Sequence, residues 1–147
     1  MKTKPIIEAQ ISTKIDPPLD VNQILPSGIK IEDVEDPNNS GNLNSYSYLQ
    51  YYMGELNKQI VEVQKNGKVI PPELKAKYTQ ANKNFLSIKS SVENNKLNQD
   101  QYKNFLNSQI VKDKIILKFL LENKQETKAE IVKRRIKMIS EEILGMN

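Results

Sequence analysis

The sequence predicts a mainly α-helical fold: an antiparallel helical hairpin or a small bundle of three to four helices, with coiled-coil-like seams and an extended N-terminal arm. Three observations support this. Apolar residues recur every three or four positions from Tyr46 onward. Asn66–Gly67 and Pro71–Pro72 interrupt that pattern, and five of the seven prolines precede it. We therefore divide the chain into an arm (residues 1–45) and a helical hairpin or bundle (residues 46–147).

The arm is predicted to be extended because no helix is expected to survive the spacing of its prolines. Residues 6–15 partly alternate and predict one β-strand, which needs a sheet edge elsewhere or stays loose. Residues 29–34 predict a second short extended piece. The arm holds four lysines against seven acidic residues, whereas residues 46–147 hold eighteen basic against eleven acidic residues. This asymmetry favours an arm-to-bundle contact or two different partner surfaces. The arm prolines are Pro5, Pro17, Pro18, Pro26 and Pro37.

Two successive heptad-like seams predict the hairpin. The first helix begins at Tyr46 and ends at Asn66–Gly67, where glycine readily takes the left-handed conformation that follows a helix. Pro71–Pro72 then open a second helix at its first turn, where proline is tolerated. A short corner between two seams predicts antiparallel neighbours. The seams consist of Leu49, Met53, Leu56, Ile60 and Val63, followed by Leu74, Tyr78, Ala81, Phe85, Ile88 and Val92.

Two further helices are predicted after residue 96. Asn98 and Gln101 fit a capping box at the start of the third helix, and Leu97 with Tyr102 fits a hydrophobic staple. A second capping box at Thr127 predicts a break near residue 125, before a fourth segment that ends at Gly145. The alternative is that the third and fourth helices form one continuous helix. The wide apolar face of the third helix predicts packing on more than one side and includes Phe105, Leu106, Ile110, Ile116, Leu117 and Leu120.

The corner between the first two helices, together with its flanks, resembles a known family. These residues are similar to the carboxy-terminal helical region of the coiled-coil and C2-domain-containing (lethal giant discs) family over roughly residues 46–143. Residues 7–19 more weakly resemble that family's final β-strand and exit linker. The matching segments are Glu55–Ile60, Val69–Leu74, Lys77–Tyr78, Gln101–Tyr102, Leu106–Gln109 and Ala129–Arg135.

The resemblance implies a non-enzymatic scaffold of endosomal sorting. Members of the family bind ESCRT-III subunits through repeated helical motifs and contact lipid through a β-sandwich. This chain has neither the repeats nor a complete sandwich. The resemblance therefore implies that both activities are lost or are supplied by another chain.

The composition gives little support to catalysis or metal binding. Cysteine and histidine are absent, which excludes thiol redox chemistry, Cys/His zinc sites and imidazole bases. Asp36, Asn38 and Ser40 match the first half of a calcium loop, but Ser47 stands where a bidentate glutamate belongs. An Asx-rich turn is the preferred interpretation. Acidic residues 32–36 are expected to be solvated, so we assign no catalytic residue, cofactor or metal.

Two groups of side chains are candidates for binding a partner. Tyr46, Tyr48, Tyr51 and Tyr52 cluster at the start of the first helix, and a hydrophobic contact with a neighbouring helix or protein is preferred over base stacking. The second group is basic and centres on residues 133–135, where a solvated face is preferred over a nucleic-acid site. The candidates outside the tyrosine cluster are Ile7, Ile11, Arg134 and Arg135.

The function expected from these patterns is that of a structural adaptor or scaffold subunit. Its partners are proteins, in a hetero-assembly or a homodimer, rather than a small-molecule substrate. An endosomal, ESCRT-III-linked regulator and a nucleic-acid-binding module stay open as alternatives. We expect a cytoplasmic location, because the chain shows neither an apolar signal region near Met1 nor a transmembrane stretch. A structural adaptor would then belong to a cytoskeletal or ciliary assembly, although no targeting motif indicates one, and the ESCRT-III-linked alternative would be associated with endosomes.

Overall fold

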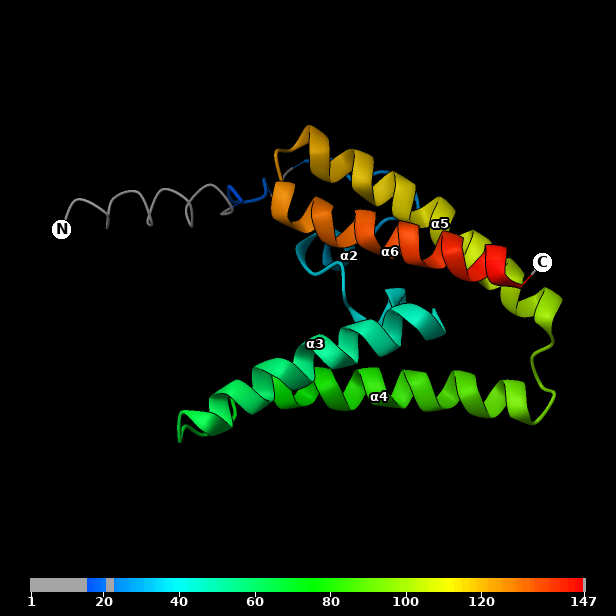
Figure 1. Ribbon diagram of the computed structural model, residues 1–147. Helices are drawn as coiled ribbons and strands as arrows, with labels where there is room; N and C mark the ends of the chain where they lie inside the picture. Colours follow the sequence, from blue (N-terminus) through cyan, green and yellow to red (C-terminus); the bar gives the residue numbers. More distant parts are fainter. Residues whose placement is uncertain (1–15, 21–22, 147) are drawn as a thin grey trace.

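Four long helices form two antiparallel hairpins in a computed structural model that describes residues 16–20 and 23–146 (Figure 1). In the first hairpin, α3 (Tyr46–Lys65) packs along α4 (Pro72–Glu93). In the second, α5 (Gln99–Glu122) packs along α6 (Glu126–Gly145). The two hairpins meet where α3 contacts α6. The mainly α-helical fold is thus confirmed.

The first hairpin follows the predicted seam over most of its length. Leu49, Leu56 and Ala81 are buried between its helices. Val92 departs from the prediction, since 47% of its side chain is exposed. Tyr46, at the start of α3, already stacks on Phe85, so Val92 lies about two turns beyond the end of the partner helix. The remaining seam residues are partly buried: Met53, Ile60, Val63, Leu74, Tyr78, Phe85 and Ile88.

The predicted corner is confirmed in detail. Asn66 ends α3, and Gly67 adopts a φ of 67°. Its N–H donates to the carbonyl of Gln64 at 3.0 Å, and the next N–H donates to the carbonyl of Val63 at 3.1 Å. This pair of bonds is a Schellman motif, which satisfies the last carbonyls of the helix. Pro71 and Pro72 then form the N-terminal boundary of α4.

The second hairpin begins as predicted, but its second helix is capped differently. Asn98 and Gln101 form the expected capping box at the start of α5. The break before α6 is also present. Thr127, however, does not cap α6. Instead, its N–H donates to Asp16 Oδ1 at 2.8 Å, and the N–H of Lys128 donates to Asp16 Oδ2 at 3.2 Å. The Asp16 carboxylate therefore caps the N-terminus of α6, a role that the local sequence had suggested for Thr127.

The arm differs most from the prediction. Residues 31–35 form the short helix α2 (Ile31–Glu35) where an extended piece was expected, and Ser40–Asn42 form a 3₁₀ turn, η1. One helical turn fits because Pro26 and Pro37 both lie outside it. Val34 is fully buried in the apolar cluster of α5 and α6, and Leu43 is buried in that of α3 and α4. The described part of the arm therefore contributes buried residues to the cores of both hairpins, which is an arm-to-bundle contact of the kind that the charge asymmetry favoured. The predicted strand over residues 6–15 lies outside the described residues.

Candidate functional site

A buried ion pair lies where α5, α6 and the arm meet. Arg135 donates from Nε and Nη2 to the two carboxylate oxygens of Asp113, each at 2.8 Å. Its Nη1 donates to the carbonyl of Pro37 at 2.6 Å, and its guanidinium lies 5.6 Å from the ring centroid of Tyr48. Neither charged side chain is exposed. A desolvated bidentate pair of this kind holds three segments in one arrangement, because separating the partners would leave a buried charge uncompensated.

Side-chain amides connect this ion pair to the arm. Gln109 donates to Asp113 at 2.8 Å and to Asn42 Oδ1 at 3.3 Å. Asn42 in turn donates to Asp33 Oδ1 at 3.1 Å, and Lys112 Nζ lies 3.4 Å from the same oxygen. In the described part of the chain, every buried side-chain nitrogen and oxygen has a hydrogen-bond partner. The network is therefore complete without any partner molecule.

The environment of the network shifts the pKa of two of its side chains, Asp33 and Tyr48. Burial alone would raise the pKa of Asp33, but the backbone N–H of Lys30, the amide of Asn39 and a nearby lysine outweigh burial and hold it below its ordinary value. Burial raises the pKa of Tyr48, whose hydroxyl donates to Asn38 Oδ1 at 2.6 Å. Asp33 was expected to be solvated, and that expectation is wrong, since its side chain is buried.

A second polar centre forms around Glu142 near the end of α6. One of its oxygens accepts from the hydroxyls of Ser45 and Ser47 at 2.6 and 2.7 Å, and from the Ser47 N–H at 3.3 Å. The other accepts from the hydroxyl of Tyr102, which itself accepts from the Tyr46 N–H at 2.8 Å. Burial and this carboxylate raise the pKa of the Tyr102 phenol. A negative charge is thus placed at the N-terminus of α3, where the helix dipole stabilises it.

Three of the predicted partner-binding residues are buried within the chain. Tyr48, Tyr52 and Arg135 are at most 9% exposed, so none of the three is available to a partner. The two tyrosines instead make the other contact that was expected of their cluster, with neighbouring helices of the same chain. The first turns of α3 pack against the arm and α6 as well as against α4. A wider face of α3 is therefore buried there than the hairpin seam alone would bury. Burial raises the pKa of Tyr52 to about 12. Tyr46 is half-buried, with its ring 4.7 Å from that of Phe85.

Tyr51 and Arg134 stay accessible but contact each other. The Arg134 guanidinium lies 5.2 Å from the centroid of the Tyr51 ring and donates to its hydroxyl. Arg134 is exposed and Tyr51 is half-buried. The predicted basic group is therefore dispersed, with one arginine stacked on a tyrosine and its neighbour buried. Ile7 and Ile11 lie outside the described residues.

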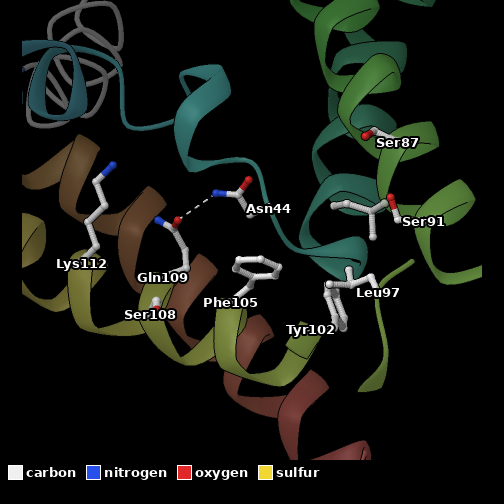
Figure 2. Close-up of a pocket in the computed structure, with 10 residues that line it drawn as sticks. Asn44, Ser87, Ser91, Leu97, Tyr102, Phe105, Ser108, Gln109 and Lys112 are labelled. Carbon is white, nitrogen blue, oxygen red and sulfur yellow. Dashed lines mark hydrogen bonds between the residues drawn. The ribbon is translucent and has the colours of Figure 1, made fainter. Parts of the chain in front are cut away.

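A groove separates the second half of α4 from the first half of α5. It has two adjacent lobes that share Ile88, Leu97 and Tyr102 as lining residues. The first lobe has a volume of about 460 Å³ and is the more polar, and the second has a volume of about 510 Å³. Figure 2 shows the first lobe, in which the Phe105 side chain projects from α5 into the space between α5 and α4. Both volumes fall in the range of binding pockets.

The walls of the groove combine an apolar surface with a polar bridge. Phe105 is 58% exposed there, although the sequence placed it on the packed face of its helix. Asn44 Nδ2 donates to Gln109 Oε1 at 3.1 Å across one end of the first lobe, so the groove adjoins the buried network (Figure 2). Sequence reasoning missed this groove because helix periodicity shows which face is apolar, not what covers it.

The segment that resembled half a calcium loop acts as a turn. Asp36 Oδ1 accepts from the N–H of Asn38 at 3.2 Å, and Asn39 Oδ1 accepts from that of Gly41 at 2.9 Å. Asn38 Oδ1 also accepts from Arg135 at 3.4 Å. Within residues 16–20 and 23–146, no group of three or more acidic side chains is arranged to hold a metal ion. These Asx turns match the preferred interpretation.

Comparisons with known proteins add no relative. No family model, curated protein or solved structure matches this chain. The resemblance to the lethal giant discs family therefore stays a prediction. Among the described helices, none is both long and apolar enough to cross a bilayer.

Proposed function

We propose that this protein is a non-catalytic structural adaptor that binds other protein chains through the groove between its two hairpins. The observation that carries the proposal is the uncovered apolar wall of this groove, where Phe105 and Val92 are 58% and 47% exposed. Large apolar side chains that line a concave surface are typical of protein-binding sites. An aromatic anchor such as Phe105 can supply a large share of the binding energy.

The buried polar groups support a scaffold role because they fix the walls of the groove. Glu142 holds the Tyr102 hydroxyl, and Gln109 is held between Asp113 and Asn44. These side chains therefore need no reordering when a partner binds, which lowers the entropic cost of association. In this proposal the hairpins form a rigid support, whereas partner contacts by residues 6–15 stay a separate prediction.

Affinity purification with two matched variants tests the proposal. Phe105→Glu places a charge in the groove, whereas Val111→Glu places one elsewhere on α5, at a side chain of similar exposure, 61%. We expect the tagged wild type and Val111→Glu to recover the same proteins from the native cells. Phe105→Glu should recover at least about tenfold less, since losing a central aromatic contact costs more than about 1.4 kcal/mol. Equal recovery by all three, with unchanged circular dichroism, would contradict the proposal.

The same purification distinguishes the kinds of assembly. Enrichment of ESCRT-III subunits, with endosomal imaging, would support the function that the family resemblance implies. Enrichment of cytoskeletal or ciliary proteins would support a structural subunit of those assemblies. Nucleic-acid binding requires RNA or DNA affinity beyond a salt-sensitive interaction with heparin. The burial of Arg135 and the stacking of Arg134 on Tyr51 reduce the basic surface available for it.

A further inference from the structure

The corner between α3 and α4 presents an apolar side chain on a fixed backbone. Val69 is 90% exposed. The Schellman bonds that end at Gly67 and Lys68 precede it, and two prolines follow it closely. Because this backbone is already constrained, burying Val69 against another molecule would require little further ordering. The corner also carries exposed lysines at positions 65 and 68.

The second lobe of the groove has the complementary chemistry. Ile88, Val92 and Leu97 provide apolar walls around its volume of about 510 Å³. The charged side chains that line this lobe are Glu93, Glu142 and Lys89, so acidic groups outnumber the basic one there, and Glu93, the last residue of α4, is exposed. Neither Glu93 nor Lys68 takes part in any of the ion pairs found in the described part of the chain. An apolar recess beside a carboxylate matches an exposed valine beside a lysine.

The corner and the second lobe lie at opposite ends of the first hairpin (Figure 1). The 22 residues of α4 separate them by about 33 Å at 1.5 Å per residue. A corner therefore cannot enter the lobe of its own chain. A corner that occupies this lobe must come from another copy of the chain.

We propose that the Lys68–Val69 corner of one copy inserts into the second lobe of another, so that the chain self-associates head to tail. Val69 packs against Val92 and Leu97, and Lys68 pairs with Glu93 of the receiving copy. This contact joins two different surfaces, so repetition produces a ring or an open filament rather than a simple two-fold dimer. The contact area is small, so the association is weak and depends on concentration. The inference rests on the proposed adaptor function and names a second copy as one partner.

Charge reversal tests the pairing. Sedimentation velocity from about 10 μM to about 1 mM, a range suited to weak interfaces, should show the wild type increasing in mean mass with concentration. Lys68→Glu alone and Glu93→Lys alone should each stay monomeric, because the corner and the lobe then carry like charges. An equimolar mixture should associate again, because each corner can then meet a lobe of opposite charge. Val69→Asp should stay monomeric, whereas Val111→Asp should behave as the wild type.

Three results would overturn the self-association. They are a wild type that stays monomeric at the highest concentration, single charge variants that associate like the wild type, and a mixture that fails to recover association. Circular dichroism of each variant checks that it is folded. Because Phe105 lines the other lobe, recovery of partners that depends on Phe105 would still support the adaptor function if the chain proved monomeric.

Discussion

Arg135 and Asp113 show how single residues determine the arrangement of this molecule. Their ion pair is fully buried, Arg135 also donates to Pro37 of the arm, and Gln109 links Asp113 to Asn42. A buried ion pair contributes little net stability compared with apolar residues, but it is costly to break from one side. We infer that the pair specifies how the arm sits on the second hairpin.

Removing one partner of this pair should destabilise the protein strongly. Arg135→Ala leaves Asp113 buried without its cation, and we expect a loss of about 3–5 kcal/mol in the free energy of unfolding. The double variant Arg135→Met with Asp113→Leu should lose less than Arg135→Ala alone. Lys133→Ala, which removes an exposed ion pair with Glu130, should change stability by no more than about 0.5 kcal/mol. Urea unfolding followed by circular dichroism measures all three variants. If Arg135→Ala lowered the free energy of unfolding as little as Lys133→Ala, the buried ion pair would not hold the arm on the second hairpin.

The raised pKa of Tyr52 predicts that the free energy of unfolding decreases at alkaline pH. Burial raises its pKa to about 12 from an ordinary 10.0. Between these values the unfolded chain ionises the phenol while the folded chain keeps it neutral. The stabilising contribution is therefore complete below pH 10 and is lost as pH rises toward 12. Free energies of unfolding measured from pH 9 to 12 should fall less steeply for Tyr52→Phe than for the wild type, and parallel curves would exclude this contribution.

Some of these residues could have been recognised from the sequence. Gln109 and Asp113 occupy the same helix face as Leu106, Ile116 and Leu120, with spacings of three and four. Polar residues within such an apolar face indicate a buried network that needs a partner. The identity of that partner, an arginine 22 residues later, could not be predicted because it depends on how the two helices pack.

At the scale of the elements, local signals predicted the helices better than their caps. The α3/α4 corner and the start of α5 follow from Gly67, the two prolines and the Asn98 capping box. The caps supplied from a distance could not be predicted in this way. Asp16 caps α6 from the arm, and Glu142 reaches the N-terminus of α3 from the end of α6. Both contacts span about a hundred residues of chain and depend on tertiary packing.

Asp16 should therefore stabilise α6. Asp16→Ala removes the acceptor of two N–H groups, and we expect a loss of about 0.5–2 kcal/mol in the free energy of unfolding. Asp16→Asn keeps a good capping oxygen without the charge and should lose less. Urea denaturation together with amide hydrogen exchange at Thr127 and Lys128 measures the effect. Exchange rates unchanged in Asp16→Ala would show that the arm does not cap this helix.

At the scale of the whole molecule, the arm and the two hairpins form one structure. Val34 packs with the second hairpin and Leu43 with the first, while the polar network joins the segment between them to α5 and α6. The sequence suggested a boundary at residue 45 because proline and acidic residues are concentrated before it. Composition could not reveal that a few apolar residues of this segment complete both cores. The groove, with walls from both hairpins, depends on this arrangement.

The most direct test of the account compares two truncations by urea unfolding, with far-UV circular dichroism as the signal. Removing residues 1–15 leaves every interaction described above in place, so the remaining chain should unfold in one cooperative transition. Removing residues 1–45 exposes the cavities left by Val34 and Leu43 and leaves Gln109 and Arg135 without their hydrogen bonds to the arm. We predict reduced helicity and a broad transition, or none, for residues 46–147. Full helicity with a sharp transition in that fragment would contradict the claim that the arm belongs to the core.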